Sequence, residues 1–412
     1  MDLVITGGGL SGLSLAVALA GLGEACPRTH IVEARPDYIR DRTWSYWRLH
    51  GHAFDSVART RWSRCLVRGG GRAVHFDAGD TPYETIDAHD VYNDVLARLK
   101  DHPRISLSLG TPVNSVQDGS DGVTVETPAG SVRARMCIDT RPPAWNRNTK
   151  GPALVQGLNQ AFAGIEIETD RPCFDPDEVI LMDFLDPTHL GEMRFFYVLP
   201  YSPTRALVED TRFTPLADAP PPLEGLEEAV ARYVGAPFTI HYQEAACLPM
   251  VSDVGMEPAA RGSRIVKIGG ASGALRPSTG YGFLAIQRQV EALADAVGRH
   301  GLQTEALRAV VSTRPAWLSA MDRVWLRVLR HHPDMGPLLS ALIFEKASTP
   351  RAIRFLADTG TLVDAASVVL ALPKAPFLMT AASLLLGLKE FGPRGAAPVA
   401  AETKDPVDGM PA

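Results

Sequence analysis

Six residues close to the N-terminus, Gly7-Gly8-Gly9-Leu10-Ser11-Gly12, match the pattern G-x-G-x-x-G. In that pattern the glycines let the backbone approach a pyrophosphate, and the start of a helix offers it free N–H groups. Glu33 stands 21 residues after Gly12, where a carboxylate can accept hydrogen bonds from ribose hydroxyls. The motif therefore predicts a dinucleotide site whose contacts are Gly7, Gly9, Leu10, Gly12 and Glu33. The alternative is a glycine-rich turn in an unrelated α/β protein.

A second glycine cluster, Gly269–Gly273, lies late in the chain. It follows a predicted strand at Arg264–Ile268 and runs through Pro277–Gly282 into a predicted helix. The first motif does not distinguish FAD from NAD, but in two-domain flavoproteins a late strand–glycine–helix element closes over the flavin ring. The positive end of that helix dipole can stabilise the negative charge of a reduced flavin. We therefore predict FAD as the cofactor, with further contacts from Gly270, Gly273, Thr279, Gly280 and Tyr281; the alternative is a second, unrelated turn.

Glu209 and Asp210 are adjacent carboxylates that follow a strand-like run, Arg205–Val208. We expect them at the end of that strand, where neighbouring side chains can meet different environments. A carboxyl in an apolar pocket has a raised pKa and can donate a proton. The pair therefore supplies two candidates for a catalytic acid, and the alternative is a solvated acidic pair in a loop.

Two aromatic clusters stand out. Thr43–Trp47 contains three aromatic residues in five, and Phe195-Phe196-Tyr197 forms the second cluster. Because an aromatic face attracts a cation, such side chains can stabilise a carbocation. The candidates for this role are Trp44, Tyr46, Trp47 and Tyr197. The alternative is ordinary packing in a core or an interface.

Composition and charge exclude several classes of protein. The 412 residues include 41 Lys plus Arg against 47 Asp plus Glu, a net charge of -6, whereas phosphate backbones require a basic field. Nucleic acid is therefore not an expected partner. The 11 histidines and 5 cysteines show no metal-ligand spacing, so we expect no metal site and reduced thiols. No leader sequence opens the chain, and no apolar run reaches the roughly 20 residues of a spanning helix, which predicts a cytoplasmic protein.

The elements that must position these residues begin with a strand–helix–strand unit. Apolar periodicity predicts strands at Leu3–Ile5 and His30–Ala34, with a helix at Leu13–Leu22 between them. Further along it predicts helices at Ile86–Leu99 and Phe283–Val297. Strand-like runs broken by prolines fill most of the interval between those two helices. This order of elements predicts an α/β protein with two cores and a helical end.

The domain boundaries follow from these elements. Residues 1–45, 86–150 and 263–300 are predicted to form a discontinuous FAD-binding domain of the Rossmann type. Residues 46–85 and 151–262 are predicted to form a mixed β-sheet substrate domain. The remaining parts are a helical C-terminal region at residues 301–392 and a flexible tail at residues 393–412.

Several short motifs occur together in one known family. The most specific is Leu199-Pro200-Tyr201-Ser202-Pro203-Thr204-Arg205, which runs into Val208-Glu209-Asp210-Thr211. Arg42-Thr43-Trp44-Ser45-Tyr46, Leu248-Pro249-Met250 and Gly273–Tyr281 accompany it. Over roughly residues 1–378 the chain resembles the bacterial lycopene β-cyclases, which are FAD-dependent carotenoid cyclases. The resemblance implies a flavoprotein fold of the glutathione-reductase-like, hydroxylase-type class.

The resemblance also implies a reaction. Glu209 would protonate the terminal double bond of the linear ψ-end of lycopene, and the neighbouring double bond would attack the tertiary cation. Loss of a ring proton then leaves a β-ionone ring. The reaction is redox-neutral, yet the family requires reduced FAD, with NAD(P)H as the expected reductant, because an anionic flavin can stabilise the cation.

Two other functions remain open on the same scaffold. One is a flavin-dependent monooxygenase of a lipophilic substrate, and the other is a cyclase of another polyene or of a meroterpenoid. Hydroxylases of this class typically carry Gly-Asp in the late glycine motif, whereas this chain has Gly269-Gly270. The sequence therefore favours a cyclase over a hydroxylase.

A lipophilic polyene resides in bilayers, so the resemblance implies contact with a membrane surface. Met321–Leu329 and Leu362–Leu388 are apolar segments with interspersed Arg and Lys, which can reach anionic headgroups. We therefore expect a cytoplasmic enzyme that is peripherally associated with the inner face of the membrane. The alternative is that these segments form a helical lid on the flavin domain.

Overall fold

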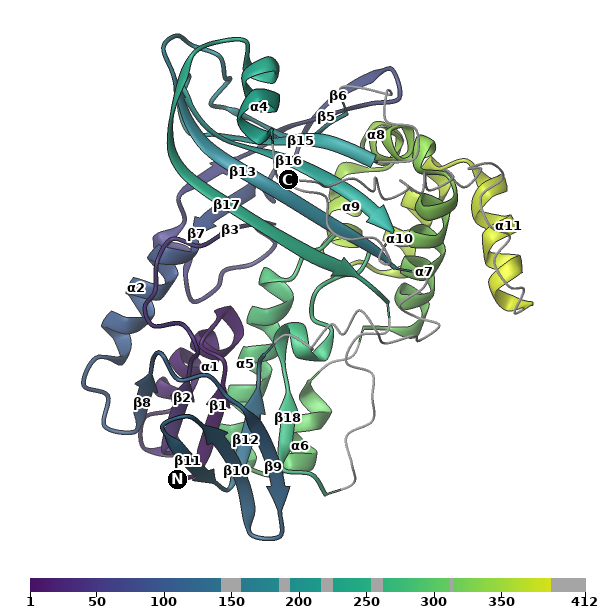
Figure 1. The fold of residues 1–412 in the computed structure, drawn as a ribbon. Helices are drawn as coiled ribbons and strands as arrows, with labels where there is room; N and C mark the ends of the chain where they lie inside the picture. The colour runs from purple at the N-terminus through teal and green to yellow at the C-terminus, as the bar shows by residue number, and fades with distance from the viewer. Residues whose placement is uncertain (142–156, 185–192, 216–224, 253–261, 312–313, 387–412) are drawn as a thin grey trace, which may run out of the picture.

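Two large sheets and a group of C-terminal helices make up the structure. It is a computed structural model that describes residues 1–141, 157–184, 193–215, 225–252, 262–311 and 314–386. Figure 1 shows a sheet of short strands at one end, a sheet of long strands at the other, and the C-terminal helices beside the long strands. The predicted tail at residues 393–412 lies outside the described residues.

A parallel sheet carries the N-terminal glycine motif. Its strands are β1 (Leu3–Thr6), β2 (Thr29–Val32), β8 (Ile105–Ser108), β12 (Met136–Asp139) and β18 (Ile265–Lys267). They pair in the order β18-β12-β1-β2-β8, each parallel to its neighbour. All four residues of β1 are buried, as expected for a strand in a sheet covered on both faces. Helix α1 (Leu10–Ala20) begins inside the glycine motif, which confirms the predicted strand–helix–strand unit.

The helices packed around this sheet are α1, α2 (Ala88–Leu99), α5 (Phe283–His300) and α6 (Thr304–Val310). Helix α5 buries the predicted face, which comprises Phe283, Ile286, Val290, Leu293 and Val297. The helix predicted from Ile86 starts two residues later, because Ile86 and Asp87 end strand β7 (Tyr83–Asp87). A buried strand residue directly before a helix continues the apolar pattern, so periodicity alone extends the helix too far.

The second large sheet has seven strands. They are β5 (Arg64–Gly69), β6 (Arg72–Asp77), β13 (Leu158–Thr169), β14 (Glu178–Asp183), β15 (Met193–Pro200), β16 (Arg205–Pro215) and β17 (Phe238–Met250). The order is β17-β13-β16-β15-β14-β5-β6, and all pairs are antiparallel except β14 with β5. One face packs against helix α4 (Leu226–Val234) through a small core that includes Ile165, Val198 and Val208. The opposite face is directed toward the C-terminal helices.

Two small sheets complete the β structure. One contains β3 (Thr43–Trp47), β4 (Thr60–Trp62) and β7, and the other contains β9 (Ser115–Gly119), β10 (Gly122–Thr127) and β11 (Gly130–Ala134). Short 3-10 helices lie at Gly23–Ala25, Asp55–Val57, Gly269–Ser272 and Pro333–Met335. Tyr46 and Phe54 fall in the range predicted for the substrate domain, yet they are buried in the core around α1, α2 and α5.

The C-terminal region is helical, with α7 (Ala316–His331), α8 (Gly336–Lys346), α9 (Thr349–Leu356), α10 (Leu362–Ala371) and α11 (Lys374–Leu385). The segment Met321–Leu329 lies in α7, where Asp322, Leu326 and Leu329 are buried, and its apolar residues pack in the core beneath the seven-stranded sheet. Helix α11, in contrast, has no buried residue and projects from the edge of the molecule in Figure 1. Among the described helices none is both long and apolar enough to cross a membrane.

Candidate active site

A largely apolar cavity of about 740 Å³ lies between the parallel sheet, the seven-stranded sheet and the C-terminal helices. Gly9 and Leu10 line it at the end of the parallel sheet, and Phe377 and Leu378 of α11 line the opposite end. One face of the seven-stranded sheet forms a wall between them. The volume falls in the range of about 300 to 1,000 Å³ that is typical of small-molecule sites.

Gly7 and Gly12 shape the turn between β1 and α1. Gly7 has φ of +102°, a conformation that favours glycine. A Cβ at Gly12 would stand 2.0 Å from the carbonyl oxygen of Gly7, so the helix can begin this close to the strand only without a side chain there. Gly9 and Leu10 face the cavity, and no side chain caps the first turn of α1. The start of α1 therefore offers backbone N–H groups to the cavity, an arrangement that binds anions.

Glu33 supports this turn from the end of β2. Its Oε2 accepts a hydrogen bond from the backbone N–H of Gly8 at 2.5 Å, and its Oε1 accepts one from the backbone N–H of Arg35 at 2.8 Å. Burial raises the pKa of Glu33, but the hydrogen bonds and charge of Arg35 and the Gly8 N–H outweigh burial, so its pKa is lowered overall. Glu33 is thus an ionised carboxylate beside the glycine turn, and Arg35, which contacts it, lines the cavity.

The residues predicted around the second glycine cluster divide into two groups. Gly270 lies in the 3-10 helix Gly269–Ser272 and Gly273 directly follows it, and both are outside the cavity lining. Thr279, Gly280 and Tyr281 line the cavity just before α5 begins. Like α1, α5 has no side-chain cap on its first turn.

A buried ion pair fixes the turn that carries Thr279, Gly280 and Tyr281. Arg276, which is 2% exposed, donates from Nη2 to Oδ1 of Asp322 in α7 at 3.0 Å. Its Nη1 donates to the backbone carbonyl of Phe355 in α9. The C-terminal helices therefore position this part of the cavity wall.

Glu209 and Asp210 lie in the middle of β16, not at the end of a strand as predicted, because β16 continues to Pro215. Adjacent side chains of a strand point to opposite faces. Glu209 lines the cavity, whereas Asp210 forms ion pairs with Arg194 at 2.7 Å and Arg212 at 3.1 Å. Of the two candidate acids, Glu209 alone borders the cavity.

A second glutamate, Glu244 of β17, meets Glu209 across a glycine. Gly164 of β13 is paired with Glu209 on one side and with Glu244 on the other. A Cβ at Gly164 would stand 2.7 Å from Cγ of Glu209, so a larger residue would push the carboxyls out of place. Each carboxyl shifts the pKa of the other, as expected for two neighbouring carboxyls that share one proton.

The surroundings of the two carboxyls differ. Burial raises the pKa of Glu209 well above its ordinary value, and the charge and hydrogen bond of Glu244 raise it further. The pKa of Glu244 is also raised, because burial outweighs the hydrogen bonds of Tyr242 and Thr43, the neighbouring Glu209 and the charge of Arg40, which all act to lower it. The hydroxyls of Tyr242 and Thr43 donate to Glu244 at 2.7 and 3.1 Å, an arrangement that favours the anion on Glu244 and the shared proton on Glu209.

Trp44 and Tyr197 line the cavity, and Tyr46 and Trp47 do not. Tyr46 stacks on Phe283 with ring centroids 4.2 Å apart, and Trp47 packs against Tyr83 with centroids 4.8 Å apart. Both are almost fully buried in the hydrophobic cores, so these two side chains serve in ordinary core packing.

Tyr83, Tyr92 and Glu244 also border the cavity, and none of them was predicted from the sequence. Tyr83 accepts hydrogen bonds from the hydroxyls of Tyr197 at 3.1 Å and Tyr281 at 3.5 Å, and it lines the cavity with them. Glu244 stands alone among uncharged residues of a strand, without a local motif. In the sequence it is a single carboxylate followed by two small residues, Ala245 and Ala246, a pattern that does not by itself indicate a site.

One group of possible metal ligands exists among the described residues. His52, Asp55 and Glu84 place ligand atoms within 4.8 Å of one another. Arg48 and Arg61 form ion pairs with Glu84 at 3.3 and 3.1 Å, so its charge is already balanced. These three residues lie outside the cavity lining.

A Rossmann-type parallel sheet, a seven-stranded mixed sheet and a cavity between them define a two-domain α/β protein of the hydroxylase-type flavoprotein fold. Solved structures agree with this class. Klebsiella pneumoniae HpxO complexed with FAD and uric acid matches with a TM-score of 0.63 and 18% identity, over 88% of this chain and 98% of that chain. A geranylgeranyl bacteriochlorophyll reductase-like protein from Thermoplasma acidophilum matches with a TM-score of 0.59 and 14% identity, over 94% and 99%. At these identities the likeness shows the fold alone.

The chain belongs to the lycopene cyclase protein family, whose profile matches residues 2–382. It is 32% identical over 173 residues to a lycopene beta-cyclase of a Paracoccus species, covering 41% of this chain and 44% of that protein. It is 26% identical over 331 residues to the chloroplastic lycopene beta cyclase of Arabidopsis thaliana, covering 73% and 60%. A chloroplastic neoxanthin synthase of Solanum tuberosum is 27% identical over 183 residues, covering 40% and 35%. The chain thus spans about half the length of the curated relatives it matches.

Proposed function

We propose that the protein is a carotenoid cyclase that converts the linear ψ-end groups of lycopene to β-ionone rings by acid-initiated, redox-neutral cyclisation. The observation that carries the proposal is Glu209, a buried carboxyl with a raised pKa in the wall of an apolar cavity. A carboxyl that such a place keeps protonated at neutral pH can act as a general acid toward an alkene. Membership of the lycopene cyclase family supports this substrate class.

FAD is the cofactor that we propose for this site, and the residues present fit it. The uncapped start of α1 at Gly9 and Leu10 suits a pyrophosphate, and Glu33 is an ionised acceptor beside it. Thr279, Gly280 and Tyr281 would hold the ring end, close to the uncapped start of α5. When bound in its reduced form, FAD would supply a negative charge that favours a cation in the cavity; NAD(P)H is the proposed reductant.

The chain's own residues account for the remaining steps. Glu209 gives its proton to the terminal double bond. Phe162, Phe195 and other apolar side chains of the wall exclude water, which would otherwise trap the cation. Trp44 and Tyr197 present aromatic groups to the same space, where they would stabilise positive charge.

We also propose that α10 and α11 contact a membrane surface. Large apolar side chains are exposed along both helices, including Leu370 at 75%, Leu378 at 67%, Met379 at 73% and Leu385 at 88%. Because Leu378 also lines the cavity, the exposed apolar surface is continuous with the cavity wall. A bilayer at this face would let a lipophilic substrate enter without crossing water.

The decisive test is an anaerobic assay with lycopene and dithionite-reduced enzyme, in which rings formed are counted against reductant consumed. We expect rings with reduced FAD, little activity with oxidised FAD, and no stoichiometric loss of reductant. Glu209→Gln should retain FAD binding and lose activity by about 10³-fold, within the range of general acid catalysis. One reductant consumed per product together with oxygen uptake would instead identify a monooxygenase, and activity confined to other polyenes would redirect the substrate.

A further inference from the structure

The two carboxyls differ in their hydrogen-bond donors, because neighbouring hydroxyls donate to Glu244. Oε2 of Glu244 accepts from the hydroxyl of Tyr242 at 2.7 Å and from that of Thr43 at 3.1 Å. In the described part of the chain, its buried Oε1 has no hydrogen-bond donor, and a proton on the neighbouring carboxyl of Glu209 would supply one. A carboxylate with two hydroxyl donors is stabilised as an anion.

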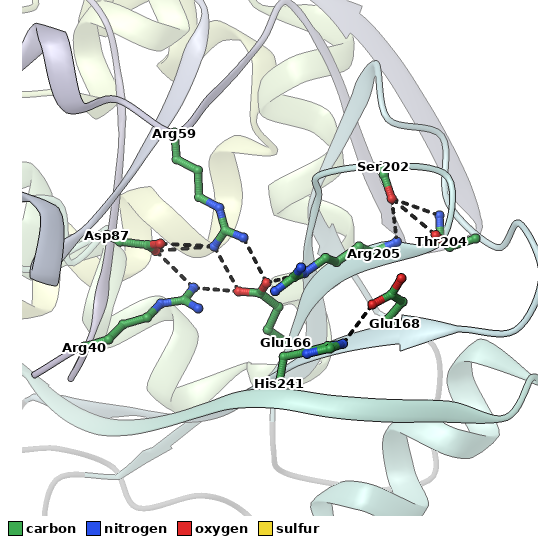
Figure 2. A network of polar contacts seen from close by, with 9 residues as sticks. All are labelled: Arg40, Arg59, Asp87, Glu166, Glu168, Ser202, Thr204, Arg205 and His241. Atoms are coloured by element: carbon green, nitrogen blue, oxygen red, sulfur yellow. Dashed lines mark hydrogen bonds and ion pairs between the residues drawn. The ribbon is translucent and has the colours of Figure 1, made fainter.

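A positive charge lies behind Glu244. The guanidinium of Arg40 stacks on the ring of Tyr242 at 3.8 Å from its centroid. Figure 2 shows Arg40, Arg59 and Arg205 converging on the buried carboxylate of Glu166, with Asp87 beside Arg40 and Arg59. Three guanidiniums thus face two carboxylates in this network, and the excess positive charge favours an anion at Glu244.

We propose that Glu244 is the second acid–base residue of the site: it receives the proton that the new ring loses and returns it to Glu209. This inference rests on the cyclase function proposed above. Glu244 lines the cavity beside Glu209 and faces the substrate space itself. It would therefore act on the substrate directly, in addition to holding the proton on Glu209.

The proton balance closes without any further reagent. The O–H bond of Glu209 breaks as the electrons of the terminal double bond form a C–H bond at its inner carbon, which leaves a tertiary cation at the outer carbon. The electrons of the neighbouring double bond then form the C–C bond that closes the ring and leave the positive charge on a ring carbon. A ring C–H bond then breaks, its electron pair forms the ring double bond, and its proton passes to the carboxylate of Glu244. Transfer along the hydrogen bond to Glu209 restores the starting state.

The geometry of the ring favours neighbouring acid and base groups. The carbon that gains the proton and the carbon that loses it are both bonded to the same quaternary carbon of the new ring. Two carboxyls that meet across Gly164 can therefore reach both positions. After the first transfer the pair would consist of two adjacent buried carboxylates, a state that strongly favours recovery of a proton.

The test compares Glu244→Gln with wild type, using lycopene and reduced enzyme and analysing every cyclised product. The amide keeps the shape of the side chain but is a poor proton acceptor. We expect β-ring formation to fall about 100-fold, and an increased share of ring products with a displaced double bond or with a hydroxyl from water. Glu168→Gln is the matched control, because Glu168 lies on β13, is exposed and pairs with His241, away from the cavity.

The flavin absorbance and melting temperature of each variant establish whether it is folded. If Glu244→Gln is unfolded, Tyr242→Phe serves instead, since it removes the 2.7 Å hydrogen bond and leaves both carboxyls; a smaller shift in the product mixture is expected. Wild-type rate and products in these variants would overturn the role of Glu244. Equal loss in Glu209→Gln and Glu244→Gln with no new product would also overturn it, since both would then serve only proton donation. A wild-type protein that forms no ring refutes the proposed function instead.

Discussion

Replacing Gly164 with alanine should separate Glu209 from Glu244 without removing either carboxyl. The backbone of Gly164 does not have positive φ, so alanine is compatible with its conformation and the effect is steric. The new methyl would stand 2.7 Å from Cγ of Glu209 and 3.2 Å from Cδ1 of Leu207. Carbon atoms in contact lie about 3.5 Å apart or more. Cγ of Glu209 must therefore move by at least 3.5 − 2.7, or about 0.8 Å.

A shift of that size breaks the carboxyl pair. Misplacing a catalytic group by about 1 Å lowers the rate about 10²-fold, and overpacking a core lowers the free energy of unfolding by about 1 to 3 kcal/mol. We expect both effects, measured as the rate of ring formation with reduced enzyme and as the midpoint of urea unfolding. Gly298→Ala is the control, because Gly298 is an exposed position in α5 where the nearest atom to a new Cβ is a side-chain carbon of Leu22 at 3.3 Å. Undiminished activity in Gly164→Ala would show that the contact between the carboxyls is not needed.

Three further predictions concern stability and the membrane. Hydrogen bonds from Arg354 lower the pKa of Asp364 to about 2, and Asp364 also caps α10 together with Thr361. The resulting stabilisation is present above the pKa of Asp364 in the unfolded chain and is lost as the pH falls through its pKa in the folded protein. Asp364→Asn should therefore have a lower melting temperature than wild type near neutral pH and the same melting temperature in strong acid. Burial raises the pKa of Glu209 in the folded protein, so the free energy of unfolding of wild type should fall as the pH rises through that pKa, whereas that of Glu209→Gln should not. Urea titrations of both proteins over a series of pH values measure this difference, and the same dependence of unfolding free energy on pH in both would contradict the prediction. Replacing Leu378 and Met379 together with serine should reduce co-flotation with anionic vesicles while leaving the melting temperature unchanged, and undiminished flotation would place the lipid contact elsewhere.

Local patterns in the sequence were sufficient for the parallel-sheet half of the molecule. The spacing of glycines before a helix and the burial of β1 follow from rules that act within a few residues. The carboxyl pair follows no such rule. Glu244 is 35 residues from Glu209 in the chain, and only the register of β17 and β16 on either side of Gly164 brings them together. Register depends on the whole sheet, so no short motif encodes it.

Packing determines which of the predicted aromatic residues border the cavity. Trp44 and Tyr46 occupy the same face of β3, but α5 places Phe283 against Tyr46 and leaves Trp44 on the cavity. Sequence composition identified the cluster, and only the position of a helix more than 200 residues later decided which member meets the cavity.

The ion pairs of Asp210 have a consequence for the fidelity of the sheet. In a strand, a slip of one residue exchanges the two faces. If β16 slipped by one position, Asp210 would enter the cavity, and Glu209 would face the apolar core under α4. Arg194 of β15 would then lose its partner, and Arg212, which lies two residues after Asp210 on the same strand, would turn to the cavity face with it, at a substantial electrostatic cost for partly buried groups. These arginines never touch the cavity, yet they help to ensure that the side chain presented there is an uncharged acid and not an ion-paired aspartate.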